Sequence, residues 1–152
     1  MITQPKTSRL IEVVQRELMS SIAPLLTDPS AIANVHMIHQ ILGTIGIRAE
    51  HEIAWLIEEI GQLEALGQQV VDAMPTATTV ASALAASRAA ASPSLHLDDV
   101  CARYSVASEI LSCCAEAVPE DCPLNAAVQQ VLDARLANEA TVIGDFTLVG
   151  RT

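Results

Sequence analysis

The sequence predicts an all-α helical bundle, and three observations lead to that prediction. About half of the 152 residues are apolar, yet aromatic side chains make up only 2% of the chain. A core built from Leu, Ile, Val and Ala suits helices that approach one another closely. Strong helix formers are abundant, and apolar residues recur at helical spacing along most of the chain. A chain of this length fits one domain, so we expect a single helical domain over residues 1–152.

The first predicted helix covers residues 8–26. Thr7 or Ser8 is placed to cap its first turn, and Pro24 is expected to kink or end it. Its apolar positions follow helical spacing and are Ile11, Val14, Leu18, Ile22 and Leu25.

The second predicted helix, residues 29–74, carries the strongest pattern in the chain. Asp28 and Pro29 form a typical helix start, and the next proline is Pro75. Between them an apolar seam advances in alternating steps of three and four residues, as in coiled coils and long bundle helices. An unbroken helix would be about 70 Å long. It either bends near Gly43–Gly46 or projects and packs against another subunit. The seam positions are Ile32, Val35, His39, Leu42, Gly46, Ala49, Ile53, Leu56, Ile60, Leu63, Gly67, Val70 and Met74.

The remaining chain is divided by prolines. Residues 76–91 are rich in Ala, Ser and Thr and form either a helix with a small-residue face or a partly ordered connector. Two further helices are predicted over 95–118 and 123–138, the second opening at Pro123. Residues 140–152 are expected to form an extended tail.

The net charge of −10, from eight basic and eighteen acidic residues, disfavours several partners. Nucleic-acid binding requires clustered positive charge, which is missing, and anionic membrane surfaces are disfavoured for the same reason. The uncharged stretch Pro29–Ile47 contains two histidines, an asparagine and a glutamine, so we expect a buried helix there and no membrane span. The first residues lack the apolar run of a signal peptide, so we expect a cytoplasmic protein.

Four cysteines, Cys101, Cys113, Cys114 and Cys122, are expected to be reduced thiols in that compartment. No Cys-x-x-Cys pair occurs, so none of them is expected to bind zinc.

The residues that could carry a site are His36 and His39, one turn apart on the second helix, and Glu17 on the first. In an antiparallel hairpin Glu17 would lie roughly opposite His39. Two imidazoles and a carboxylate can hold a divalent metal. The alternative is structural, with His39 in the seam bonded to Glu17. The acidic residues further along this helix, including Glu58 and Glu59, are interpreted as a solvated face. No catalytic motif or cofactor motif is recognisable, so the sequence predicts no cofactor and gives an enzyme no support.

The first two predicted helices resemble a family of short, uncharacterised bacterial helical proteins, whose genes often accompany acyl-CoA dehydrogenase and phosphotransferase-like genes. The resemblance covers about a third of the chain and implies an accessory role in acyl-CoA or related lipid metabolism, with no catalytic residues to transfer. It rests on Leu10-Ile11-Glu12-Val13-Val14, Glu17-Leu18, Ile22-Ala23-Pro24-Leu25-Leu26, Val35-His36, Arg48 and Glu50.

The leading functional hypothesis is a non-catalytic helical protein that forms a homodimer and serves as an accessory subunit. The seam from Ile32 to Met74 is longer than the other predicted helices can cover, and an uncovered apolar strip is costly in water. A two-fold arrangement is the commonest way to cover it. The alternative is a small-molecule or metal-binding protein, including an enzyme, that uses His36, His39 and Glu17.

Overall fold

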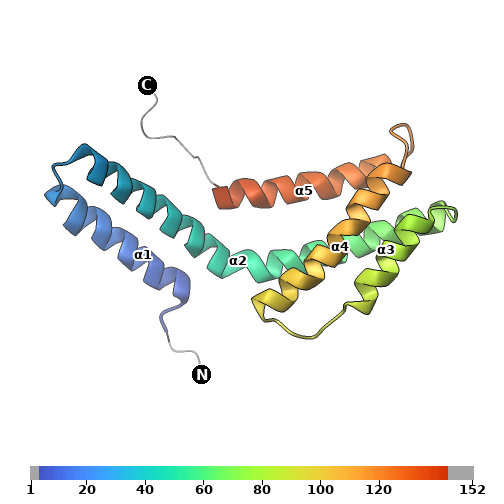
Figure 1. The fold of residues 1–152 in the computed structure, drawn as a ribbon, viewed down its shortest axis with the longest axis horizontal. Helices are drawn as coiled ribbons and strands as arrows, with labels where there is room; N and C mark the ends of the chain where they lie inside the picture. Colours follow the sequence, from blue (N-terminus) through green and yellow to red (C-terminus); the bar gives the residue numbers. More distant parts are fainter. Residues whose placement is uncertain (1–3, 144–152) are drawn as a thin grey trace. The chain divides into compact units, whose positions relative to one another are not determined.

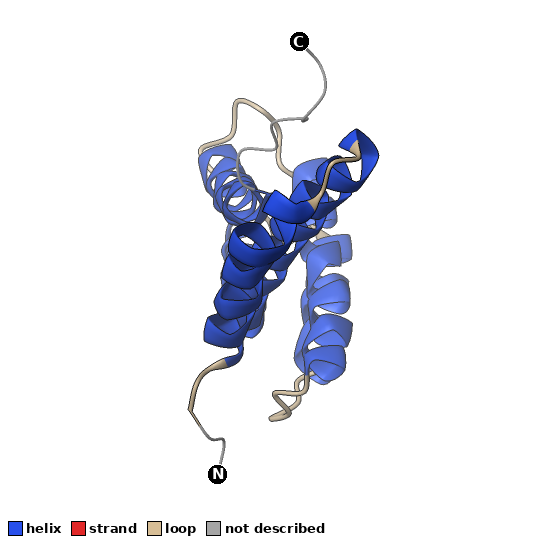
Figure 2. Ribbon diagram, turned by 90° about the vertical axis from the view of Figure 1, so that its left-hand side faces the viewer, coloured by secondary structure: helices blue, strands red, loops and turns tan. Residues whose placement is uncertain are grey.

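The computed structural model of the protein describes residues 4–143. Within this range the chain forms five α-helices and no strand (Figures 1 and 2), so the all-α prediction is confirmed. None of the helices in the described range has the length and apolarity needed to cross a bilayer. The helices are α1 (Thr7–Glu17), α2 (Pro29–Ala73), α3 (Thr78–Ala89), α4 (Leu97–Ala117) and α5 (Asn125–Ile143).

The predicted first helix is a composite of three helical forms. α1 begins with Lys6 at the N-cap position and has no side-chain cap, so the predicted cap by Thr7 or Ser8 is wrong. A π-helical turn over Leu18–Ile22 and a 3-10 turn over Ala23–Leu25 follow. The change of form accords with Pro24, which has no N–H to donate and whose ring crowds the carbonyl one turn earlier.

α2 is a single 45-residue helix that continues through Gly43 and Gly46. Its start is as predicted. The backbone N–H of Ala31 donates to Oδ2 of Asp28 at 2.9 Å, and Pro29 occupies the first helical position. A carboxylate at this point satisfies one of the unpaired N–H groups of the first turn.

The segment 76–91, for which the sequence left two interpretations, contains the helix α3. Its buried residues Val80, Ala83, Leu84 and Ser87 repeat at helical spacing, and α3 packs against α4. Ala83 and Ser87 on this face are small and allow α3 and α4 to approach each other closely. Packing against α4 thus stabilises the helix, which the sequence did not predict.

α5 is longer than predicted. It continues to Ile143, so residues 140–143, predicted to belong to the extended tail, are helical. Helix formers such as Ala137, Glu139 and Ala140 continue the pattern of the preceding turns. The rest of the predicted tail, residues 144–152, lies outside the described residues.

The chain divides into two compact units, and α2 contributes to both. Unit 2, residues 53–138, contains the main apolar core, to which the second half of α2 and the helices α3, α4 and α5 contribute. The largest side chains that are completely enclosed there are Leu63, Val70, Val80, Val100, Ile110, Cys114 and Val128.

The core of unit 2 corrects one premise of the dimer argument. Ile60, Leu63 and Val70 belong to the seam of α2, and all three are buried by the chain's own helices. Gly67 faces the same interior, because a Cβ placed on it would lie 2.8 Å from Cγ2 of Ile110 on α4. The second half of the seam therefore needs no other subunit to cover it.

Unit 1 comprises residues 1–52 and 139–152. Within it α1 and the first half of α2 form an antiparallel pair, which we call the hairpin (residues 7–52; Figure 1). Gln15 Nε2 donates to the carbonyl oxygen of His39 at 2.9 Å, and a Cβ on Gly46 would lie 3.6 Å from Cγ2 of Ile11. The hairpin is poorly filled, because Val35 is its only buried apolar residue among those described.

Candidate functional site

The structure places the three residues of the predicted corner in the hairpin without joining them. Glu17 is exposed, and its carboxylate accepts a hydrogen bond from Ser21 Oγ at 2.9 Å. His36 and His39 are half-buried on α2. Nδ1 of His39 is enclosed and has no hydrogen-bond partner, whereas its backbone carbonyl accepts from Gln15.

No group of three His, Cys, Asp or Glu side chains in residues 4–143 is arranged to hold a metal ion. A catalytic zinc site needs three protein ligands, so the described corner lacks that donor set. A role for His39 in binding another kind of ligand stays a prediction.

The most enclosed polar cluster lies in unit 2, at a place that the sequence did not indicate. Glu59 of α2 is only 7% exposed. Its Oε1 accepts a hydrogen bond from Oη of Tyr104 on α4 at 2.9 Å and one from Nε of Arg135 on α5 at 2.6 Å. Nη2 of Arg135 also donates to Oγ of Ser108 at 3.4 Å, and its guanidinium lies 5.5 Å from the centre of the Tyr104 ring.

These contacts explain why a carboxylate is tolerated in the core. A buried carboxylate is costly unless it is paired and hydrogen-bonded, and Arg135 and Tyr104 supply both. Burial raises the pKa of Tyr104, and the hydrogen bond and the negative charge of Glu59 raise it further. The cluster joins α2, α4 and α5, so its evident role is to hold these three helices in register.

The interpretation of Glu58 and Glu59 as one solvated face is therefore wrong for Glu59. Glu58 is exposed as expected. Glu59 instead lies on a second three-four line along α2, whose other members Leu63, Leu66 and Val70 are all buried. That line was a signal available in the sequence. No comparable local signal marked Arg135, whose partner is 76 positions away.

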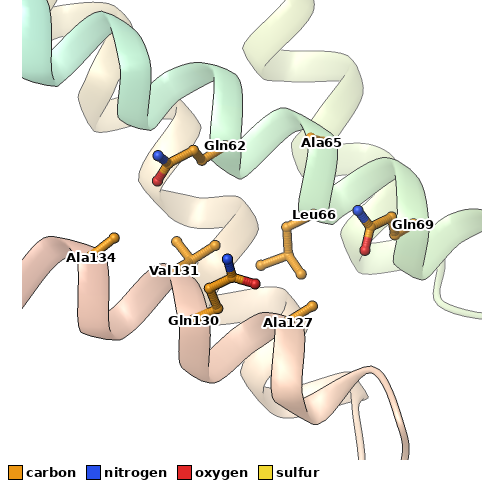
Figure 3. A pocket seen from close by; sticks show the side chains of 8 residues that line it. All are labelled: Gln62, Ala65, Leu66, Gln69, Ala127, Gln130, Val131 and Ala134. Carbon is orange, nitrogen blue, oxygen red and sulfur yellow. The ribbon is translucent and has the colours of Figure 1, made fainter.

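A groove of about 220 Å³ lies between α2 and α5 in unit 2 (Figure 3). Leu66 and Val131 form its apolar floor, and alanines of both helices leave it open. Three carboxamides, those of Gln62, Gln69 and Gln130, lie around the floor, and no charged side chain lines it. Such a groove can hydrogen-bond an uncharged polar group, but it holds nothing suited to acid–base or nucleophilic chemistry.

The four cysteines are free. Cys114 is completely enclosed in the core of unit 2. Burial, together with the neighbouring Cys113, raises its pKa to about 11, and burial also raises the pKa of Cys113. A thiol with a raised pKa is a poor nucleophile at neutral pH, because the reactive form is the thiolate.

Large apolar side chains are exposed along the hairpin and the turns that join its two helices. They are at least 43% exposed, although each is large enough to contribute to a core. Exposed apolar surface on this scale commonly marks a binding surface. The residues are Leu10, Val13, Val14, Ile22, Leu25, Met37, Ile38, Ile41 and Ile45.

Charge is distributed unevenly over the two units. Residues 53–138 contain three basic and eleven acidic residues, a net charge of −8. Residues 1–52 contain four basic and five acidic residues, a net charge of −1. The hairpin, residues 7–52, has a net charge of −2 and exposes large apolar side chains, whereas unit 2 is strongly acidic.

Comparison of the chain with protein-family models, with curated protein sequences and with solved structures found no match.

Proposed function

We propose that the protein is a non-catalytic helical protein that forms a homodimer through its hairpin and serves as an accessory subunit in the cytoplasm. The proposal assigns no reaction and no cofactor to the chain. Following the family resemblance, the process that it serves is acyl-CoA or related lipid metabolism.

The observation that carries the proposal is the contrast between what the hairpin exposes and what it buries. Nine large apolar side chains are exposed there, whereas Val35 is the only buried apolar residue among the described residues of the hairpin. Ordering each residue costs conformational entropy, which apolar burial normally offsets. A hairpin with so little burial gains most from a partner that covers its apolar surface.

The size of this surface fits a dimer. Complete burial of one such side chain contributes about 2 kcal/mol, which at about 25 cal/mol per Å² corresponds to about 80 Å² of apolar surface. Nine side chains that are about half exposed therefore offer on the order of 400 Å². A homodimer interface of standard size buries about 800 Å² per partner, of which about two thirds is apolar. The two areas are of the same order, so the exposed residues on one side of the hairpin would supply a substantial part of the apolar area of a dimer interface.

The distribution of charge supports association through the hairpin. Two copies that met through residues 53–138 would bring together surfaces with a net charge of −8 each. Like charges in contact are costly and are screened only in part by salt. Residues 1–52, with a net charge of −1, carry almost no such penalty.

The test is the mass of the wild-type protein in solution, measured by sedimentation equilibrium at micromolar concentration. The chain has a mass of 16.1 kDa, so a dimer has twice that mass. Raising the salt concentration should leave the dimer intact or strengthen it, since its interface is apolar. A monomer at every concentration tested would overturn the proposal.

A further inference from the structure

We infer that two copies of the chain pack hairpin against hairpin through one flank, formed by Leu10 and Val14 of α1 and Ile38 and Ile45 of α2, to make a four-helix bundle. We call these four residues the flank patch. The inference rests on the proposed self-association and adds the surface and the arrangement by which it occurs.

Within the hairpin, one side of each helix faces the other helix. On α1 the facing residues are Ile11 and Gln15, and on α2 they are His39 and Gly46. Gly43 belongs to the same side, because a Cβ placed on it would lie 3.2 Å from Nε2 of Gln15.

Four exposed residues of the hairpin are sequence neighbours of those facing positions. Leu10 and Val14 each directly precede a facing residue of α1, and Ile38 and Ile45 each directly precede a facing residue of α2. One residue turns an α-helix by about 100°. Because the two helices run in opposite directions, the same step back along each helix turns toward the same flank of the hairpin. The four side chains therefore share one flank.

All four residues of the flank patch are about half exposed. Ile41, also exposed, is two positions before Gly43, so it lies on the outer side of α2 and outside the patch. Two helices with a continuous apolar flank are one half of a four-helix bundle, in which the apolar flanks of two hairpins enclose a common core.

A second copy fits this flank better than a membrane does. A two-fold interface brings the same patch of both subunits together, so an apolar, nearly neutral patch is complementary to itself. Helices that lie on membranes instead carry a surplus of Lys and Arg on their polar face. Residues 1–52 contain four basic residues against five acidic ones, so that surplus is missing.

The sharpest test compares two adjacent valines. Val14 lies in the flank patch and is 53% exposed, whereas Val13 is 43% exposed and two positions before Gln15, so it points away from both α2 and the flank. Val14→Glu should raise the dimer dissociation constant by about a hundredfold or more, because it buries an unpaired charge in the interface. Val13→Glu should change it by less than about threefold, since its side chain stays in water.

Ile45→Glu should act as Val14→Glu does, from the other helix. Both positions are exposed within one chain, so each variant should retain the helical circular dichroism and urea midpoint of a monomeric fold. Sedimentation equilibrium of the wild type and of all three variants gives the dissociation constants.

The outcomes separate this inference from the proposed function. A wild-type dimer that is weakened equally by Val13→Glu and Val14→Glu, or by neither, would overturn the flank patch and leave self-association standing. A wild-type monomer would overturn both. A wild-type monomer that floats with phosphatidylcholine vesicles, and loses that property on Val14→Glu, would assign the flank to a membrane in place of a second copy.

Discussion

Arg135 on α5 and Glu59 on α2 form an ion pair inside unit 2, with Nε and Oε1 2.6 Å apart. The same two helices line a groove with apolar, small and amide side chains. On α5 Val128 and Val131 are buried, and Ala127 and Leu132 are partly buried against the same core. The polar cluster thus adds an ion pair to the apolar contacts that attach α5 to α2.

Arg135→Ala should lower the free energy of unfolding by about 2–4 kcal/mol, because it leaves the carboxylate of Glu59 buried without its cation. Urea unfolding followed by circular dichroism measures the change. The matched control is Arg9→Ala, which removes the exposed Arg9–Glu12 pair of α1 and should cost less than about 0.5 kcal/mol. Equal effects of the two substitutions would contradict the assignment of Glu59 to the interior.

Two glycines of α2 should respond in opposite directions to alanine. Gly67→Ala should destabilise the protein by about 1–3 kcal/mol, since its Cβ would overlap the enclosed Ile110. At Gly61 nothing lies within 4 Å of an added Cβ, so Gly61→Ala should stabilise the helix by about 0.5–1 kcal/mol. Thermal unfolding of both variants tests the packing of α4 against α2. Stabilisation by Gly67→Ala would show that this packing is looser than described.

Cys114 should be the slowest of the four cysteines to react with iodoacetamide in the folded protein. Its thiol is enclosed, and its pKa of about 11 leaves little thiolate at pH 8. Peptide mass spectrometry after timed alkylation measures each site separately. All four sites should react at similar rates in urea, and rapid labelling of Cys114 without denaturant would contradict its burial.

Stability should decrease between about pH 9 and pH 11. The pKa of the Cys114 thiol is raised from 9.0 to about 11 by burial and by Cys113, and that of Tyr104 is raised by burial and by Glu59. In this range the unfolded chain has released protons that the folded chain still holds, so rising pH favours unfolding. The share of Cys114 is about 1–3 kcal/mol, and Cys114→Ala should reduce the dependence on pH by that amount. A flat profile in urea unfolding across this range would refute it.

Local pattern determined much of the fold. The spacing of apolar residues predicted α1, α2, α4 and α5 within a few residues of most of their ends, and Asp28 with Pro29 fixed the start of α2. These features depend on neighbours one or two turns apart, which a sequence displays directly. The length of α2 follows from the same pattern, because no proline interrupts it before Pro75.

Tertiary contacts decided which residues of the seam of α2 are buried within the chain. The sequence shows one apolar line from Ile32 to Met74 but not which part of it the chain itself covers. The structure buries Ile60, Leu63 and Val70 in unit 2 and leaves a different set of side chains exposed on the hairpin. On α2 the flank patch lies about 100° around the helix from the seam, on the side that the position of α1 defines.

The burial of Glu59 depended on distant residues in the same way. Its partners Tyr104 and Arg135 lie 45 and 76 positions away. From local sequence, a carboxylate on a helix is predicted to be exposed to solvent. Its burial depends on a cation and a hydroxyl from other helices, which no local pattern indicates. Helix formation is set by neighbours in sequence, whereas the cost or gain of burying a charge is set by neighbours in space. The sequence alone therefore determined four of the five described helices. The tertiary structure decided the fate of residues 76–91 and which side chains form the core, the polar cluster and the exposed flank.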